Sequence, residues 1–347
     1  MRWLRRTGLR PYLQRMTEQP PPPLAHPLAL TMGEPAGIGA EIARAAWQAL
    51  RGSGPAFVLI DDIRRHPGAR QVAGPEEAAA IFPHARPVLH QPLAEPAVPG
   101  RINPANAAAT IASIDTAVAL AKAGRVGGVV TNPIQKSALY AAGFKHPGHT
   151  EYLHELAGAA SQPVMLLASE QLRVVPVTIH EPLRDAIARL TPALIVEIAT
   201  LTAAGLRQDF GIANPRLAIA GLNPHAGEGG SLGREDIEVV APAVAQLRAM
   251  GLDARGPMPP DTMFTAQARP GYDVAICLYH DQALIPIKTL DMNGGVNVTL
   301  GLSIVRTSPD HGTALDIAGT GTADPASLIA AIRLASLIAG HRQCASR

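Results

Sequence analysis

The sequence predicts an α/β protein with two domains. Short apolar runs alternate with segments of helical spacing along most of the chain, an order that is typical of α/β folds. A length of 347 residues exceeds what one ordinary core accommodates and suits two domains. Hydrophobic residues make up 47% of the chain and charged residues 17%, which is the balance of a globular protein.

The composition argues against several classes of protein. The formal net charge of +2 does not suggest a nucleic-acid binder, and no apolar run reaches the length of a membrane helix. The two cysteines, Cys277 and Cys344, form neither a disulfide framework nor a CxxC site, so a reducing compartment such as the cytoplasm is expected. We therefore expect no nucleic-acid partner and no membrane partner.

The first 26 residues differ from the rest of the chain. They carry five arginines against one glutamate, lack the apolar stretch of a secretory signal and end soon after four consecutive prolines. A polyproline-type tract joins neither a helix nor the centre of a sheet. We expect a disordered basic extension over residues 1–26, although a transit peptide or a partner-binding arm would have a similar composition. The folded body is expected to begin near Pro27.

The first half of the folded body predicts three strands and two long helices. The strands are expected at residues 28–32, 57–60 and 127–131, and the helices at 41–50 and 106–123. The loop after the first strand reads GEPAGIG. It lacks the GxGxxG spacing, so it fits a tight turn or a phosphate-binding loop. The Pro-rich stretch at residues 64–103 is ambiguous.

The second half continues the alternation. Strands are expected at residues 164–168, 174–179, 217–220 and 273–278, and helices at 192–205, 236–250 and 325–339. Thr191 and Pro192 predict a helix start, because threonine caps helices and proline fits the first helical position. Gly205 is a plausible end for that helix.

Three histidines end apolar runs or lie in turn-rich loops: His180, His225 and His280. Any one of them alone is more often a hydrogen-bonded structural residue than a ligand. At the ends of separate strands of one sheet, three would converge, and three ligands with an open position build a catalytic zinc-type site. Asp281 and Glu228 are candidate partners that would orient these ligands, although each fits equally well as a cap or a surface charge.

Further polar groups gather between residues 272 and 324. Lys288, Asn297 and Arg306 lie near predicted strand ends or loops, and a Gly-rich loop around DHGTALD follows them. Each cation taken alone fits a solvated charge. A metal ligand, anion-binding cations and a nucleotide-type loop would together form one active site.

Two earlier loops carry polar groups that fit the same site. Lys136 lies in TNPIQK, directly after a predicted strand. His149 and Thr150 follow Pro147 and Gly148, where threonine also fits a helix N-cap and nothing more. Local spacing alone does not decide between the structural and the functional interpretation.

These motifs together resemble those of the PdxA family of 4-hydroxythreonine-4-phosphate dehydrogenases, enzymes of the pyridoxal phosphate pathway. The matching segments, in the family's order and with similar spacing, are GEPAGIG, TNPIQK, GHTEYL, VTIHEPLRD, GLNPHAGEGGSLGREDIE, GPMPPDTMF, LYHDQALIPIK and VNVTLGLSIVRTSPDHGTALDIAGTGTAD. The resemblance covers nearly everything from residue 28 onward. GLNPHAGEGG and YHDQ followed by DHGTALDIAG are the most diagnostic segments.

The resemblance implies a divalent metal (Zn, Mg or Co) held by His180, His225 and His280. The third of these histidines would be donated across a homodimer interface, so that each active site needs both subunits. The implied contacts to a small phosphorylated substrate are His149, Thr150, Lys288, Asn297 and Arg306.

The loop DHGTALDIAG is similar to the adenosine-binding loop of isopropylmalate dehydrogenases. The similarity places His311, Gly312, Thr313 and Asp316 at the cofactor. Asp316 stands where an acidic residue binds the ribose hydroxyls, which favours NAD over NADP because a 2′-phosphate would be repelled.

The implied fold is the two-domain fold of isocitrate and isopropylmalate dehydrogenases, with a cleft between the domains. The first domain, on the NAD side, would comprise residues 27–140 and 290–347. The second domain, residues 141–289, would carry the metal ligands and the dimer interface.

The implied reaction is NAD-dependent oxidation of 4-phosphohydroxy-L-threonine to a β-keto acid that decarboxylates to 3-amino-2-oxopropyl phosphate. Lys136 and Asp281 are the candidates for the general base. The TNPIQK loop and Ala283 depart from the family's common pattern, which leaves 4-phospho-threonate, 4-phospho-erythronate or an aromatic cis-dihydrodiol open as substrates. A phosphotransacetylase-like acyltransferase or a non-catalytic phospho-ligand sensor would belong to another class, and the adenosine loop and the three histidines count against both.

Overall fold

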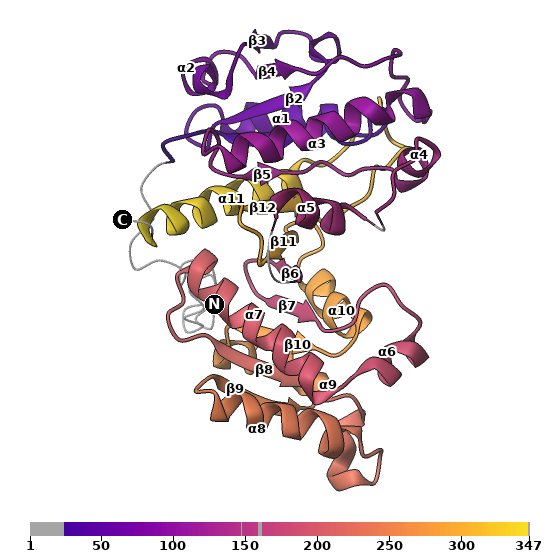
Figure 1. Cartoon of the computed structure of the whole chain (residues 1–347), viewed down its shortest axis with the longest axis vertical. Coiled ribbons are helices and arrows are strands. Elements are labelled where there is room, and N and C mark those ends of the chain that lie inside the picture. The colour runs from indigo at the N-terminus through magenta and orange to yellow at the C-terminus, as the bar shows by residue number, and fades with distance from the viewer. Residues whose placement is uncertain (1–23, 147, 159–161, 346–347) are drawn as a thin grey trace, which may run out of the picture. The chain divides into compact units, whose positions relative to one another are not determined.

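The computed structural model describes residues 24–146, 148–158 and 162–345. They divide into two compact units. The N/C unit contains residues 24–163 together with 296–345, and the middle unit contains residues 164–295. Figure 1 shows how the yellow C-terminal elements lie beside the indigo and magenta N-terminal elements within the N/C unit.

The strands of the N/C unit follow the order β3-β4-β2-β1-β5-β12-β11. Neighbouring strands are parallel, except that β11 and β12 are antiparallel. The bounds are β1 Leu28–Thr31, β2 Phe57–Asp61, β3 Arg70–Val72, β4 Pro87–His90, β5 Val129–Val130, β11 Val296–Leu300 and β12 Arg306–Pro309. The central strands β1 and β2 are buried along their whole length, as expected for parallel strands covered on both faces.

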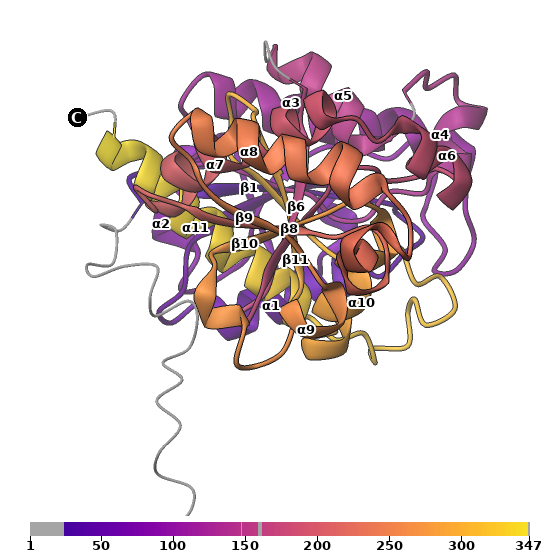
Figure 2. The same ribbon diagram turned by 90° about the horizontal axis from the view of Figure 1, so that it is seen from below.

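Helices cover both faces of these strands. Figure 2 shows α3 and α5 on one side and α1 and α11 on the other, and the packing of α3 against β1 and of α11 against β12 agrees. The bounds are α1 Gly39–Leu50, α2 Ala78–Ile81, α3 Ala107–Lys122, α4 Lys136–Ala141, α5 His149–Ala157 and α11 Ala326–Ala345. The ambiguous Pro-rich stretch proves to contain β3, α2 and β4.

The strands of the middle unit follow the order β6-β7-β10-β8-β9. The β6 and β7 pair is antiparallel and the other pairs are parallel. The bounds are β6 Val164–Ala168, β7 Arg173–Pro176, β8 Arg216–Ala220, β9 Asp253–Met258 and β10 Val274–Cys277. Strand β9 was not predicted, because its sequence DARGPM has neither an apolar run nor a clear alternation.

The helices of the middle unit pack on both faces of these strands, with α7 and α8 on one face and α10 on the other (Figure 2). The bounds are α6 Leu183–Arg189, α7 Pro192–Phe210, α8 Ala241–Ala249, α9 Pro260–Met263 and α10 His280–Leu290. A π-helical turn, Asp236–Val240, leads into α8, so the helix predicted at 236–250 is present in two parts.

Helix α7 begins as predicted and ends later. The hydroxyl of Thr191 accepts a hydrogen bond from the amide of Leu194 at 3.2 Å, which caps the helix, and Pro192 is its first residue. The predicted end at Gly205 is wrong: Gly205 is buried within the helix, and Gly211, with φ of 66°, ends it. An interior glycine is tolerated here because the helix packs against the strands.

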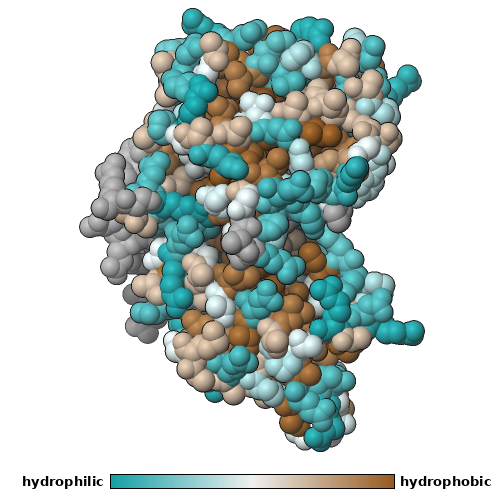
Figure 3. Space-filling view, in the orientation of Figure 1, coloured by the Kyte–Doolittle hydropathy of each residue, from teal (hydrophilic) through white to brown (hydrophobic). Residues whose placement is uncertain are grey.

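The structure confirms the predicted α/β class. No single helix within the described ranges has the length and hydropathy of a membrane span, and α6 with α7 meets both criteria only as a pair bent by 91°. Figure 3 shows apolar residues, in brown, reaching the surface of both units on the face that it presents.

Candidate active site

Two of the three predicted metal-binding histidines lie together in the middle unit. His180 follows β7 and His280 follows β10, and these strands are parallel neighbours whose carboxyl ends meet. The two imidazole rings are 5.8 Å apart between centroids. The sheet therefore brings together two side chains that are one hundred residues apart in sequence.

Asp281 holds the ring of His280. The carboxylate oxygen Oδ1 of Asp281 lies 2.7 Å from Nδ1 of His280. The side chain of Asp281 is 70% exposed. A carboxylate on Nδ1 fixes the ring orientation and leaves Nε2 available for a ligand, as in many metal-bound histidines. The donor set of two imidazoles and one orienting carboxylate fits a divalent transition metal.

A pocket of about 280 Å³ opens beside these rings. It is lined by Thr178, Ile179, His180, Glu181, Leu183, Ala186, Tyr279, His280 and Asp281. The end of β10 is held in place by Gln282, whose amide accepts a hydrogen bond from Leu278 N and donates one to Gly221 O, both at 2.7 Å. The rigid strand end gives the pocket a fixed wall.

His225 does not join the other two histidines. It lies in the loop after β8, where His225 and Glu228 have positive φ values of 52° and 42°, and its Nδ1 is 4.0 Å from a carboxylate oxygen of Asp261. Asp236 anchors the loop by accepting hydrogen bonds from the amides of Leu222 and Asn223. Over the part of the chain that the structure describes, no three metal-binding side chains cluster.

Arg306 is a buried cation in the N/C unit. Its guanidinium donates to the hydroxyls of Thr299 at 2.9 Å and of Thr131 at 2.8 Å. Its Nε has no hydrogen-bond partner among the described residues. Burial lowers the pKa of Arg306 to about 10, so the side chain still carries its charge at neutral pH.

Asn297 adds a second unsatisfied polar group to the same pair of strands. It lies on β11, opposite Ser308 of β12, and its side-chain oxygen is buried without a hydrogen-bond partner in the described residues. Buried polar groups in proteins are nearly always paired, and exceptions tend to mark functional sites. The antiparallel β11 and β12 thus bring together two of the predicted substrate contacts.

The predicted cofactor loop packs against the GEPAGIG loop. The amide of Ile38 donates to the carbonyl of Thr313 at 3.1 Å, and the hydroxyl of Thr313 donates to Gln135 at 3.2 Å. A side chain at Gly37 would lie only 2.8 Å from the carbonyl of Thr313, so only glycine fits there. GEPAGIG is therefore a close-packed turn, in which Gly37 allows the loop at residues 310–316 to pack closely.

Glu34 of this turn was not among the predicted site residues. Its carboxylate is buried and accepts a hydrogen bond from the amide of Ala36 at 3.0 Å. Burial raises its pKa, although the Ala36 hydrogen bond and the charge of Arg65 oppose that shift. The only available signal was an acidic residue inside a Gly-rich turn.

The remaining predicted residues have varied surroundings. His311 and Gly312 adjoin Thr313, with Nδ1 of His311 2.9 Å from the carbonyl of Gly312, and Asp316 is exposed. Lys136 is exposed at the start of α4, and Lys288 is half-buried in the last turn of α10. His149 and Thr150 begin α5, and their side chains lie outside the described structure.

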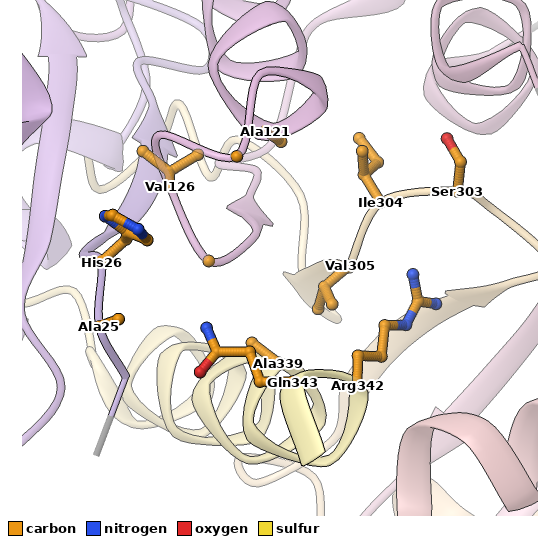
Figure 4. A pocket seen from close by; sticks show the side chains of 12 residues that line it. Ala25, His26, Ala121, Val126, Ser303, Ile304, Val305, Ala339, Arg342 and Gln343 are labelled. Atoms are coloured by element: carbon orange, nitrogen blue, oxygen red, sulfur yellow. The ribbon is translucent and has the colours of Figure 1, made fainter. Parts of the chain in front are cut away.

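A larger pocket of about 420 Å³ lies elsewhere in the N/C unit. Figure 4 shows His26, Arg342 and Gln343 around it, together with small apolar side chains. None of the predicted site residues lines this pocket. This larger pocket is therefore not the one that the motifs indicate.

Comparison with known proteins agrees with the motifs. Residues 56–335 match the family model of the pyridoxal phosphate biosynthetic protein PdxA. A 4-hydroxythreonine-4-phosphate dehydrogenase of Caulobacter vibrioides is 56% identical over 329 residues, which cover 92% of this chain and 99% of that protein.

Solved structures give the same result. A 4-hydroxythreonine-4-phosphate dehydrogenase from Klebsiella pneumoniae is 38% identical, with a TM-score of 0.80 over 91% of this chain and all of that one. A terephthalate 1,2-cis-dihydrodiol dehydrogenase from Burkholderia xenovorans is 33% identical, with a TM-score of 0.61 over 90% of this chain and 98% of that one. The resemblance, the fold class and the expectation of a dehydrogenase are confirmed, and the chain belongs to the PdxA family of pyridoxal phosphate biosynthetic proteins.

Proposed function

We propose that the chain oxidises 4-phosphohydroxy-L-threonine with NAD in the biosynthesis of pyridoxal 5′-phosphate. The hydroxyl-bearing carbon would give its hydride to the nicotinamide and its hydroxyl proton to a base. The resulting β-keto acid would lose CO₂ to form 3-amino-2-oxopropyl phosphate. The observation that carries the proposal is the buried guanidinium of Arg306, which two hydroxyls hold and which has no carboxylate partner among the described residues.

A phosphorylated substrate would satisfy these buried groups. The threonines that hold Arg306 are neutral and do not compensate its charge, and the oxygen of Asn297 is unsatisfied in the described residues. A guanidinium binds phosphate through two parallel hydrogen bonds, which fixes the orientation of the group. His149, Thr150 and Lys288 are proposed as the further substrate contacts.

We propose a divalent metal (Zn, Mg or Co) as a second requirement, with His180, His225 and His280 as its ligands. When bound, it would act as a Lewis acid toward the substrate hydroxyl. The proximity of His180 and His280 and the carboxylate on His280 support two of these ligands. Asp281 would position His280, which leaves Lys136 as the proposed proton acceptor.

The separation of His225 from this pair supports a homodimer in which one subunit completes the site of the other. The resemblance assigns His280 to the second subunit, yet His280 lies beside His180 of its own chain. Among the described residues, exposed large apolar side chains concentrate in the middle unit, including Leu183, Ile187 and Leu232. Such residues are typical of subunit interfaces.

The cofactor is proposed to bind the N/C unit. The exposed carboxylate of Asp316 is free to accept hydrogen bonds from ribose hydroxyls and would repel a 2′-phosphate, which favours NAD over NADP. Residues 27–140 with 290–347 would form the NAD-side domain, and 141–289 the metal-binding domain. The free thiols of Cys277 and Cys344 are consistent with a cytoplasmic enzyme.

The proposed activity is tested by following NADH formation with the purified, metal-loaded protein. Equal concentrations of 4-phosphohydroxy-L-threonine, 4-phospho-threonate and an aromatic cis-dihydrodiol would be compared. We expect selective turnover of the phosphorylated amino acid. Turnover of the threonate alone would move the protein to sugar-acid metabolism, and turnover of the dihydrodiol alone would contradict a phosphate-binding role for Arg306.

Thr131→Val is expected to raise the KM for the phosphorylated substrate about tenfold, because one hydrogen bond to a charged group is worth about 1.5 kcal/mol. The hydroxyl of Thr131 positions Arg306 and would not touch the reacting atoms. The expected change is therefore in KM more than in kcat. Steady-state kinetics of NADH formation measures both.

Thr307→Val is the matched control. Thr307 is buried on the same strand as Arg306, but its hydroxyl donates to the carbonyl of Ala331. The two variants should lose similar free energy of unfolding. Equal KM values for both would contradict a positioning role for Thr131.

A further inference from the structure

A cavity of about 320 Å³ in the N/C unit is lined by none of the residues discussed for catalysis. Its wall includes the start of α1, the segment around His66 and the glycine-containing turn at residues 319–321. Arg44, Arg65 and Arg86 all line it, so three guanidinium groups surround one cavity. Among those three, Arg86 is the unusual one.

Arg86 is a buried cation with unsatisfied hydrogen-bonding capacity. It is only 3% exposed, and its Nε has no hydrogen-bond partner among the described residues. Its guanidinium lies 6.0 Å from the ring centroid of Trp47, a weak attraction compared with an ion pair. A buried charge without a partner is costly, and proteins retain one mainly where a ligand supplies the opposite charge.

The nearby carboxylates are already engaged. Asp61 accepts hydrogen bonds from Arg65 at 2.6 and 2.7 Å and from the amide of Asp62 at 2.7 Å, and it lies 2.9 Å from Nε2 of His66. Glu41 accepts hydrogen bonds from the amides of Gly319 and Gly321. No ion pair within the described residues involves Arg44 or Arg86, so the cavity keeps an excess of positive charge.

We propose that this cavity binds a phosphate group, which Arg86 holds from the inside and Arg44 from the exposed rim. The tetrahedral oxygens of a phosphate can accept hydrogen bonds from two guanidinium groups at once, which a single carboxylate does less well. Arg65 donates hydrogen bonds to Asp61 and to the carbonyl of Pro35 at 2.7 Å. It therefore forms part of the cavity wall and is not proposed to bind the phosphate. The volume suits a small phosphorylated molecule as well as the free ion.

Two sources of phosphate fit this chemistry. One is inorganic phosphate or a small phosphate ester that binds independently of the active site. The other is a phosphate of the dinucleotide, because the turn at 319–321 continues the segment that contains Asp316. Both sources predict loss of binding when Arg86 is replaced.

Inorganic phosphate would be titrated into the full-length protein and followed by calorimetry and by tryptophan fluorescence, to which Trp47 contributes. Arg306→Met would serve as the parent protein, because it removes the guanidinium proposed to bind the substrate phosphate, and Arg306 does not line this cavity. In that parent protein, Arg86→Met is expected to weaken phosphate binding at least tenfold. Arg44→Gln, at an exposed position, should weaken it about threefold without any effect on folding.

Arg51→Gln is the matched control. Arg51 is exposed and stacks on the same Trp47, at 5.2 Å, but it does not line the cavity. Its phosphate affinity should equal that of the parent protein. Equal affinities in the parent, Arg86→Met and Arg44→Gln proteins would overturn the proposal, as would the absence of saturable binding in the parent.

NAD distinguishes the two sources. If the phosphate belongs to the dinucleotide, NAD will compete with inorganic phosphate, and Arg86→Met will raise the KM for NAD by about the same factor as it weakens phosphate binding. If the phosphate is independent, the two ligands will bind without competition. The site is tested by binding alone, so its failure would leave the proposed dehydrogenase activity untouched.

Discussion

Arg306→Met is expected to lower turnover of the phosphorylated substrate roughly a thousandfold, because a buried charge pair with substrate phosphate is worth about 4 kcal/mol. The same substitution should stabilise the folded protein. Burial lowers the pKa of Arg306 to about 10, well below its ordinary value, so the charged side chain destabilises the ligand-free folded state by up to about 3 kcal/mol. Methionine fills similar volume without that cost.

The effect of Arg306 on the free energy of unfolding depends on pH, in the direction that its lowered pKa sets. The pKa of Arg306 is lower in the folded state than in the unfolded state, so the destabilisation is fully present below about pH 10 and disappears as the pH rises toward the ordinary pKa of arginine. At neutral pH, denaturant unfolding should therefore give a higher free energy of unfolding for the variant. Kinetics of NADH formation on the same samples measures the loss of turnover.

Arg216→Met is the control for the stability effect. Arg216 binds Asp273 through hydrogen bonds of 2.8 and 3.0 Å. Burial raises the pKa of Asp273, but these bonds outweigh burial and hold the pKa below its usual value. Replacing Arg216 removes both of these hydrogen bonds from a largely buried carboxylate and should destabilise the protein by about 3 kcal/mol. Loss of stability in Arg306→Met as well would show that Arg306 is a structural residue.

His280→Ala is expected to abolish measurable turnover and to weaken metal binding about a hundredfold or more, because it removes a ligand together with the carboxylate contact that orients it. His280 begins α10 at the surface of a pocket, so the fold should tolerate the change. Metal content after dialysis and NADH formation measure the two effects separately.

His84→Ala is the control, since His84 is an exposed histidine far in sequence from every predicted ligand. It should retain the metal content and the rate of the parent protein. An unchanged rate for His280→Ala in metal-free buffer would exclude the three-histidine site.

Much of the fold follows from local patterns. The apolar runs that begin at Leu28, Phe57 and Val164 are strands, and Thr191 caps its helix as expected, because burial and capping leave direct marks in the sequence. Helix α10 was not predicted, because Pro286 lies inside it and a histidine begins it. Packing against β7 and β10 stabilises it despite the missing hydrogen bond.

The candidate site was predictable only in part. His180 and His280 come together because both follow neighbouring parallel strands, which the alternation of elements suggests. The hydrogen bond between Arg306 and Thr131 joins residues that are 175 positions apart, so no local sequence pattern predicts it. Local sequence also could not predict that Nε of Arg86 lacks a hydrogen-bond partner, because this depends on the neighbouring Arg65 binding Asp61.

Strand β12 has a consequence for synthesis of the chain. It lies between β5 and β11, and β5 also pairs with β1 near the beginning of the folded body. The N/C unit therefore has an open sheet edge at β5 until the ribosome has made β12, which begins at residue 306 of 347, whereas the middle unit can fold earlier. An exposed edge of this kind invites pairing with other chains. Chaperone binding during translation should therefore depend on β5 and end only when β12 and α11 have emerged.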